Sequence, residues 1–251
     1  MNKTVFITGA TSGIGKATAE IFAKHGCPLV LCGRRQERLD QLKQELGSQT
    51  SVHLLNFDVR DKVAVQSAIG SLPEAFANIS ILVNNAGNAH GMDTIQDGSL
   101  EDWDAMLDIN VKGLLYVSKA ILPKMISKKE GHIINIGSIA GKEVYPKGNV
   151  YCASKHAVDA INQGMLMDLN PYGIRVGAVN PGLVATEFSK VRFKDDEARA
   201  ENVYKGYQAL KPEDIADIIY FVVTRPYHVN IADLVVMPTA QASSTVINKN
   251  L

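Results

Sequence analysis

Tyr151 and Lys155, four residues apart in the stretch NVYCASKHAV (149–158), are the pair of side chains in this sequence best suited to moving a proton. If both lie on one helix, the i, i+4 spacing places them on the same face. An ammonium group close to a phenol stabilises the phenolate, which lowers a pKa that is ordinarily about 10 toward the range of a general acid-base group. Taken alone, the same spacing is common in ordinary helix-surface pairs, so its meaning depends on the residues around it.

Ser138 and Asn110 supply that context. Ser138 comes directly after the apolar run HIINIG (132–137), a predicted strand, and open α/β sheets bind ligands at the carboxyl ends of their strands. Its hydroxyl could hold a substrate oxygen against Tyr151. Asn110 lies inside a predicted helix, where a buried asparagine needs a specific partner and an exposed one is an ordinary polar residue. With Ser138 present, we interpret Tyr151 and Lys155 as an acid-base pair rather than a surface pair.

A glycine-rich turn, TGATSGIG (8–15), lies between the first predicted strand and the first predicted helix. Glycines let such a turn tighten and its backbone approach a pyrophosphate, while free N–H groups at the helix start favour negative charge. Any tight strand-to-helix turn uses glycine, but the position after the first strand favours nucleotide binding. The turn residues expected to contact the nucleotide are Gly9, Thr11, Ser12, Gly13, Ile14 and Gly15.

The end of the second apolar run, CGRR (32–35), bears on which nucleotide would bind. NAD-binding folds usually place a carboxylate here to accept hydrogen bonds from the ribose 2′-hydroxyl. Gly33 stands about where that carboxylate would be, and Arg34 and Arg35 follow it, so planar guanidinium groups could meet a 2′-phosphate. The alternative is two solvated arginines at a helix start, where positive charge is slightly unfavourable. The sequence therefore predicts NADP as the cofactor.

Short apolar runs alternate with longer amphipathic segments along most of the chain. Continuous apolar runs of this length predict strands covered on both faces, which is typical of parallel sheets flanked by helices. Helices are predicted between them, for example over 14–25 and 36–46. We expect an α/β fold with a doubly wound parallel sheet of about seven strands, at 4–8, 28–32, 51–57, 79–84, 132–137, 174–180 and 233–237.

The chain shows no low-complexity linker and no shift in composition, so we expect a single domain over 1–251. The segment 186–211 breaks the alternation, because it is charged and contains few large apolar residues. We expect it to be a lid over a substrate. The alternative, which composition alone favours, is a solvated excursion from the core.

Composition and charge restrict the class of protein. The 251 residues include 26 Lys and Arg and 26 Asp and Glu, so no net charge attracts nucleic acid or an anionic membrane. Cys27, Cys32 and Cys152 have neither CxxC spacing nor a histidine cluster, which argues against a disulfide scaffold or a metal site. The apolar run before Thr8 is too short for a signal peptide, and no run approaches the ~18 residues that span a bilayer. We expect a cytoplasmic protein.

Several motifs together resemble the short-chain dehydrogenase/reductase family, and the resemblance covers nearly the whole chain. The family implies one Rossmann-type domain, assembled as a homotetramer or dimer, that transfers a hydride between a nicotinamide cofactor and a small alcohol or carbonyl substrate. The matching stretches stand in the family's order and at its separations: TGATSGIG (8–15), FDV (57–59), NNAG (84–87), Asn110, Ser138, YCASK (151–155) and NPG (180–182).

The resemblance also implies roles for individual residues. Tyr151 would take or give the proton, Ser138 would position the substrate oxygen, and Lys155 would lower the Tyr151 pKa and hold the nicotinamide ribose. Asn110 would order a water that links Lys155 to solvent. The remaining implied cofactor contacts are Gly9, Gly13 and Gly15 at the pyrophosphate, Asp58 and Val59 at the adenine, Asn85, Ala86 and Gly87 along the middle, and Pro181, Gly182, Val184 and Thr186 beside the nicotinamide.

Within the family, stretches such as NPGLVATEFSKVRFKDD (180–196) are similar to NADP-dependent 3-hydroxy acid dehydrogenases, a group that includes serine and allo-threonine dehydrogenases. This implies serine, allo-threonine, 3-hydroxyisobutyrate or 3-hydroxypropionate as the type of substrate, and we expect Arg192 to meet its carboxylate. One alternative is a reductase of other ketones, sugars or acyl thioesters, because the catalytic residues do not encode the substrate. A second is a catalytically idle nucleotide sensor on the same fold; the presence of Ser138, Tyr151 and Lys155 argues against it.

Overall fold

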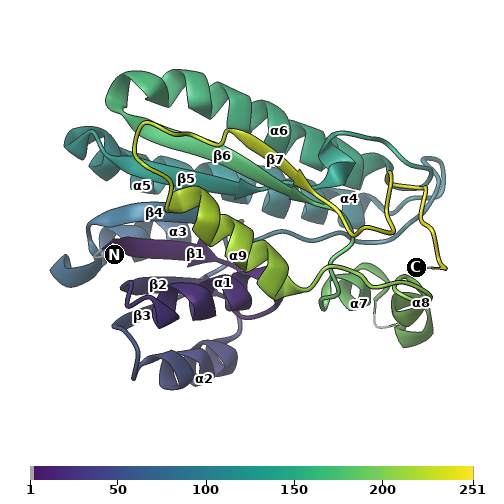
Figure 1. Cartoon of the computed structure of the whole chain (residues 1–251), viewed down its shortest axis with the longest axis horizontal. Helices are drawn as coiled ribbons and strands as arrows, with labels where there is room; N and C mark the ends of the chain where they lie inside the picture. Colours follow the sequence, from purple (N-terminus) through teal and green to yellow (C-terminus); the bar gives the residue numbers. More distant parts are fainter. Residues whose placement is uncertain (1–2, 195, 251) are drawn as a thin grey trace.

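The computed structural model describes residues 3–194 and 196–250, and these form a seven-stranded parallel sheet in the order β3-β2-β1-β4-β5-β6-β7 (Figure 1). The doubly wound sheet predicted from the sequence is confirmed, and each strand end lies within one residue of its predicted position. The strands are β1 (Thr4–Thr8), β2 (Leu29–Gly33), β3 (Val52–Asn56), β4 (Ile79–Asn84), β5 (Gly131–Ile136), β6 (Ile174–Pro181) and β7 (Asp233–Val236).

Helices cover both faces of the sheet (Figure 1). One apolar core joins the sheet to α1, α2 and α9, and a second core on the opposite face joins it to α3, α5 and α6. No helix within the described part of the chain is long and apolar enough to cross a bilayer. The helices of these two layers and of the nearby α4 are α1 (Gly13–Lys24), α2 (Gln36–Leu46), α3 (Lys62–Gly70), α4 (Leu100–Leu107), α5 (Leu114–Lys128), α6 (Asn149–Leu169) and α9 (Pro212–Val223).

The segment 186–211, expected to be a lid, lies between β6 and α9. It contains two short helices, α7 (Phe188–Arg192) and α8 (Glu197–Asn202), which lie beyond the carboxyl edge of the sheet (Figure 1). Residue 195 of this segment lies outside the described residues, as do residues 1, 2 and 251 of the domain expected over 1–251.

The order of the strands reverses between β1 and β4. The chain first builds outward through β2 and β3, then returns to the other side of β1 with β4 and continues to β7. Loops leave such a point in opposite directions and open a crevice at the carboxyl ends of the strands. The glycine-rich turn after β1 and the loop after β4 therefore flank the place where a ligand is expected.

A chain of buried amide side chains fixes the strands on one side of this crevice. The Asn84 Nδ2 donates to Ser118 Oγ and to Asn135 Oδ1, both at 2.9 Å, and Asn135 Nδ2 donates to Asn162 Oδ1 at 3.0 Å. The last hydrogen bond of this series runs from Asn162 Nδ2 to the Ala232 carbonyl, at 3.1 Å. Because an unpaired amide in the interior is costly, these bonds hold β4, β5, α5 and α6 in one arrangement.

His132 is a buried titratable group at the opposite end of β5. It is 2% exposed, and neither ring nitrogen has a hydrogen-bond partner within the described residues. Burial, together with the positive charges of Arg175 and Lys3, lowers the pKa of His132 to about 3. The folded protein therefore keeps this imidazole neutral at pH values where an unfolded chain protonates it.

This difference predicts acid sensitivity. Between pH 6.5 and about 3 the unfolded state binds a proton that the folded state does not, so the His132 contribution to the free energy of unfolding falls by about 1.4 kcal/mol for each pH unit of acidification. His132→Phe should remove this part of the slope. Urea unfolding at pH 7, 6 and 5 measures it, with the exposed His228→Phe as a control that should keep the wild-type slope. An unchanged slope in His132→Phe would show that the prediction is wrong.

Candidate active site

A cavity of about 760 Å³ lies at the carboxyl edge of the sheet, where the strand order reverses. Pockets for small ligands usually measure roughly 300–1,000 Å³, so this one has the size of a binding site. Its walls come from the glycine-rich turn, the end of β2, the loops after β4 and β5, and the segment 181–193.

Most of the residues predicted from the sequence line this one cavity. Gly15 and Asn110 are the two that are not in its wall. The predicted residues that line it are Gly9, Thr11, Ser12, Gly13, Ile14, Arg34, Arg35, Asp58, Val59, Asn85, Ala86, Gly87, Ser138, Tyr151, Lys155, Pro181, Gly182, Val184, Thr186 and Arg192.

The glycine-rich turn needs its glycines for different reasons. Gly9 and Gly13 have φ angles of +65° and +50°, a left-handed conformation that side chains with a Cβ rarely adopt. Gly15 lies behind the wall, where a Cβ would come within 2.3 Å of the Gly9 carbonyl oxygen. Gly15 therefore lets α1 pack closely against the end of β1, which leaves the first turn of α1 at the edge of the cavity.

The loop after β4 is fastened to β1 by short hydrogen bonds. The Thr8 hydroxyl accepts from the backbone N–H groups of Asn85 and Ala86, each at 2.9 Å, and Asn85 Nδ2 donates to the Thr8 carbonyl at 2.9 Å. Farther along the loop, a Cβ on Gly87 would lie 2.9 Å from Asn110 Oδ1. These contacts fix the position of the loop after β4 relative to the end of β1.

A group of positive side chains stands at the mouth of the cavity near the end of β2. Arg34 Nη1 donates to Asp58 Oδ2 at 3.4 Å, and Arg60 pairs with the same carboxylate at 2.7 Å. Arg35 Nη2 donates to Thr11 Oγ1 at 2.9 Å and to Ser12 Oγ at 2.8 Å. Both predicted arginines line the cavity and are partly open to solvent, and Arg35 is bonded to the glycine-rich turn.

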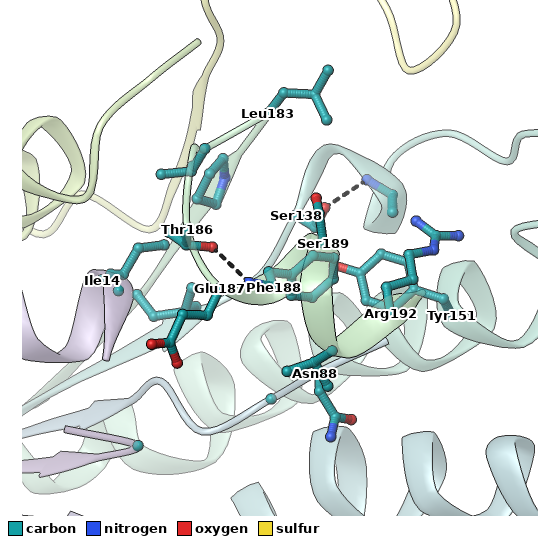
Figure 2. Close-up of a pocket in the computed structure, with 18 of the residues that line it drawn as sticks. Ile14, Asn88, Ser138, Tyr151, Leu183, Thr186, Glu187, Phe188, Ser189 and Arg192 are labelled. Atoms are coloured by element: carbon teal, nitrogen blue, oxygen red, sulfur yellow. Dashed lines mark hydrogen bonds between the residues drawn. The ribbon is translucent and has the colours of Figure 1, made fainter. Parts of the chain in front are cut away.

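Tyr151 lies in the first turn of α6, where it is 8% exposed. Burial raises its pKa well above the ordinary value, and the neighbouring Tyr145 raises it further. A hydrogen bond with Ser138 and the positive charge of Arg192 act in the opposite direction. Ser138 is held in place because its Oγ accepts from the Ala140 N–H at 3.1 Å, and Figure 2 shows it above Tyr151.

Lys155 lies one helical turn beyond Tyr151, as its spacing predicts, and is buried. Its Nζ donates to the Ile136 carbonyl at 2.9 Å, and burial lowers its pKa to about 8. The largest contributions favouring the Tyr151 phenolate come from Ser138 and Arg192. The expected effect of Lys155 on the Tyr151 pKa stays a prediction.

Asn110 sits behind the cavity in a π-helical turn, Asp108–Gly113, and is 2% exposed. Its Oδ1 accepts from the Asn88 N–H at 2.9 Å, and its Nδ2 donates to the Asn88 carbonyl at 2.8 Å and to Ser154 Oγ at 3.0 Å. Asn110 is therefore a buried residue with specific partners, not a surface position. It joins the loop after β4 to the helix that carries Tyr151 and Lys155.

Arg192, the last residue of α7, reaches into the cavity beside Tyr151 (Figure 2). Its guanidinium carbon lies 5.5 Å from the ring centroids of both Tyr145 and Tyr151, and its Nη1 donates to Tyr145 Oη at 2.9 Å. Its Nε donates to the Gly91 carbonyl at 3.2 Å. The buried Nη2 has no partner among the described residues.

Three residues of this region were not singled out from the sequence. Tyr145, in the loop before α6, holds Arg192, and Gln241 accepts from the Leu183 N–H at 2.9 Å. Glu187 pairs with Arg35 and with Arg38 at the start of α2. The only sequence signal for any of them is the position of Tyr145 between Ser138 and Tyr151, because the other contacts join residues far apart in the chain.

Known proteins resemble this chain over most of its length. A family model described as short chain dehydrogenase matches residues 3–197. The chain is 46% identical to the NADP-dependent 3-hydroxy acid dehydrogenase YdfG of Escherichia coli over 239 residues, which is 95% of this chain and 96% of the relative. It is also 46% identical to sulfoacetaldehyde reductase 2 of Chromohalobacter salexigens, over 97% of each chain.

Solved structures give the same assignment. The fold matches the closed form of serine dehydrogenase complexed with NADP+ with a TM-score of 0.92 and 45% identity, over 96% of this chain and 97% of that one. The chain belongs to the short-chain dehydrogenase family.

Proposed function

We propose that this protein is an oxidoreductase that transfers a hydride between NADP(H) and a 3-hydroxy acid, or reduces the matching 3-oxo acid. The substrate would be of the serine, allo-threonine, 3-hydroxyisobutyrate or 3-hydroxypropionate type. Arg192 carries the proposal, because its buried Nη2 has no hydrogen-bond partner among the described residues and its guanidinium lies beside Tyr151. A buried charged donor is costly until an acceptor meets it, and a substrate carboxylate is such an acceptor.

Tyr151 is the proposed acid-base group. In oxidation its phenolate accepts the proton of the substrate hydroxyl, and in reduction the phenol donates a proton to the carbonyl oxygen. NADP, when bound, supplies the acceptor or donor of the hydride. Ser138 holds the substrate oxygen against Tyr151, and a substrate carboxylate on Arg192 fixes the other end of the molecule.

Lys155 and Asn110 support this proton transfer. With a pKa of about 8, the Lys155 amine can gain or lose a proton near neutral pH, so it is suited to exchanging one with Tyr151. We propose that Lys155 also holds the nicotinamide ribose. Asn110 fixes the helix that carries both side chains, through Ser154 and Asn88.

The cavity fits NADP in two respects. Gly9 and Gly13 expose the backbone of the first turn to the cavity without a Cβ, which suits a pyrophosphate at the start of α1. At the end of β2, Gly33 takes the place of a carboxylate, and Arg34 and Arg35 line the cavity, which suits a 2′-phosphate. The other predicted cofactor contacts, from Asp58 to Thr186, belong to the same proposal.

Domain, lid, assembly and location complete the proposal. A single sheet and two continuous cores support one catalytic domain over 1–251. Residues of α7 that line the cavity support a lid over 186–211. The homotetramer is proposed from the family resemblance alone, which also allows a dimer, and the cytoplasmic location is proposed from the short apolar runs of the sequence. Within the described residues no group of three or more His, Cys, Asp or Glu side chains could hold a metal ion, so the mechanism is proposed without one.

A second substrate class has specific support. Two relatives with 46% identity are named as sulfoacetaldehyde reductases. A sulfonate carries a negative charge and oxygen acceptors, as a carboxylate does, so Arg192 could meet either group. Initial rates distinguish these two substrate classes. They would be measured on serine, 3-hydroxypropionate and neutral alcohols with NADP+ and with NAD+, and on sulfoacetaldehyde with NADPH and with NADH.

Tyr151→Phe is predicted to abolish most hydride transfer while cofactor binding persists. Loss of a general acid-base group typically lowers a rate by roughly 10²–10⁴-fold, and we expect the upper part of that range for kcat. NADPH binding, followed by fluorescence titration, should change little, since the ring is retained. A variant with near-wild-type kcat would rule out Tyr151 as the proton-transfer group.

Arg192→Ala is predicted to separate anionic from neutral substrates. We expect KM for 3-hydroxy acids to rise by roughly 10- to 100-fold, because a charge-assisted hydrogen bond and an ion pair are lost. KM for a neutral secondary alcohol should change much less. Steady-state kinetics on both substrates test this, and unchanged kcat and KM on 3-hydroxy acids would contradict the anion-binding role.

Arg34→Ala is predicted to weaken the preference for NADP over NAD. Removing one guanidinium from a phosphate site should lower kcat/KM for NADP by roughly tenfold or more, with little change for NAD. Arg60→Ala is the matched control, because Arg60 pairs with the same Asp58 but does not line the cavity. Equal kcat/KM for the two cofactors in the wild-type enzyme would overturn the assignment of the arginines.

A further inference from the structure

The short helix α7 is held to the nucleotide side of the cavity by one carboxylate. Glu187, the residue before α7, accepts from Arg35 Nη1 at 3.0 Å and from Arg38 Nη1 at 2.8 and 3.0 Å. Both arginines lie at the start of α2, about 150 residues earlier in the chain. The proton-transfer mechanism makes no use of this carboxylate, and in Figure 2 it is directed away from Tyr151.

The Glu187 contact reaches the glycine-rich turn through Arg35. The Arg35 guanidinium bonds Thr11 and Ser12 as well as Glu187, so one side chain joins the turn to the start of α7. Gly13 also lies close to the Thr186 side chain, since a Cβ on Gly13 would lie 3.2 Å from Thr186 Cγ2. The beginning of α7 therefore lies against the glycine-rich turn, which is proposed to hold the pyrophosphate.

The other end of α7 is fastened to the substrate side of the cavity. The Arg192 carbonyl accepts from the Gly91 N–H at 2.9 Å, while its side chain bonds the Gly91 carbonyl and Tyr145. Just beyond the helix, Lys194 pairs with Asp102 of α4 at 2.9 Å. The five residues of α7 rise only about 7.5 Å along the helix, so Glu187 and Arg192 are separated by little more than one helical turn. A shift of the helix at Glu187 therefore moves Arg192 as well.

The ion pairs of Glu187 are unsuited to stabilising the fold. The side chains of Glu187, Arg35 and Arg38 are each more than 40% exposed, and exposed ion pairs usually contribute little to stability. Their geometry is nevertheless specific, with two guanidinium groups converging on both oxygens of one carboxylate. Such a contact is better suited to setting the position of a short helix.

We propose that Glu187 is a positioning residue: its pairing with Arg35 and Arg38 sets α7 so that Arg192 faces the reaction site beside Tyr151. The proposal rests on the anion-binding role proposed above for Arg192. It assigns Glu187 no contact with substrate. Loss of the carboxylate should therefore affect substrates that need Arg192 and spare those that do not.

Glu187→Gln tests the proposal, with Glu197→Gln as a matched control. Glu197 lies in the same segment, is 72% exposed and pairs only with Lys190, at 3.2 Å, among the interactions of the described residues. We expect Glu187→Gln to raise KM for a 3-hydroxy acid by roughly tenfold, since small misplacements of a binding group have effects of this size or larger. The kcat for the acid and the kinetics on a neutral alcohol should change by less than about twofold. Glu197→Gln should match the wild type.

Fluorescence of Trp103 reports the position of α7 without any substrate. Trp103 is the only tryptophan in the sequence, and it packs against the same apolar cluster as Phe188 of α7. Emission of the full cofactor-free chain should shift in Glu187→Gln and stay unchanged in Glu197→Gln. A wild-type spectrum together with wild-type kinetics in Glu187→Gln would overturn the proposal.

The double variant Glu187→Gln with Arg192→Gln separates this proposal from the one on which it rests. If Glu187 acts through Arg192, adding Glu187→Gln to Arg192→Gln should cause no further rise in KM for the acid. Equal losses on acidic and neutral substrates, or additive losses in the double variant, would contradict the positioning role. If Arg192→Gln alone leaves the acid kinetics unchanged, the anion-binding role is the one that fails, and the Trp103 spectrum still decides whether Glu187 sets α7.

Discussion

The relation between three neighbouring elements, β4, β5 and α6, is the constraint on which the active site depends. Buried amides set it, since Asn84, Asn135 and Asn162 form a hydrogen-bonded chain from β4 through β5 to α6. The loop after β4 follows directly from Asn84, and Ser138 follows β5 by two residues. Tyr151 and Lys155 lie on the same α6. Hydrophobic packing alone tolerates sliding of such elements, whereas an amide pair in the interior has one satisfied geometry.

Burial shifts the pKa values of Tyr151 and Lys155, the two groups proposed to support proton transfer. It raises the pKa of the Tyr151 phenol and lowers that of the Lys155 ammonium to about 8, so each group is held toward its neutral form. The positive charge of Arg192 lies close enough to favour the phenolate, and it does so from α7, outside the α6 helix that carries both groups. Arg192, proposed to bind the substrate anion, and Tyr151, proposed as the acid-base group, are therefore electrostatically linked.

The fold and the centre of the site could be predicted from the sequence, because both depend on short-range patterns. The apolar runs predict each strand end to within one residue of its position in the structure. Tyr151 and Lys155 lie on one helix, α6, as their i, i+4 spacing predicts. The contacts of Glu187 with Arg35 and Arg38, and of Gln241 with Leu183, join residues separated by about 60 to 150 positions. No periodic pattern relates positions so far apart in the chain. From the sequence alone, a charged side chain that forms a specific ion pair cannot be distinguished from a solvated one. For Asn110 the sequence left a buried residue with a partner and an exposed position both open, and it gave no sign of the π-helical turn, because that geometry has no spacing signature.

The substrate preference of this chain depends on the part of the sequence with the least regular pattern. A guanidinium recognises negative charge and paired oxygen acceptors, and these are shared by carboxylates and sulfonates. Two relatives with the same 46% identity are named for a 3-hydroxy acid and for sulfoacetaldehyde, and a guanidinium suits the anionic group of either substrate. What must differ between such substrates is the room around the anion. In this chain that room is set by Tyr145 on one side of Arg192 and by the placement of α7 on the other. Under the proposed anion-binding role of Arg192, the geometry of α7 would matter more than the identity of Arg192 in distinguishing one acidic substrate from another.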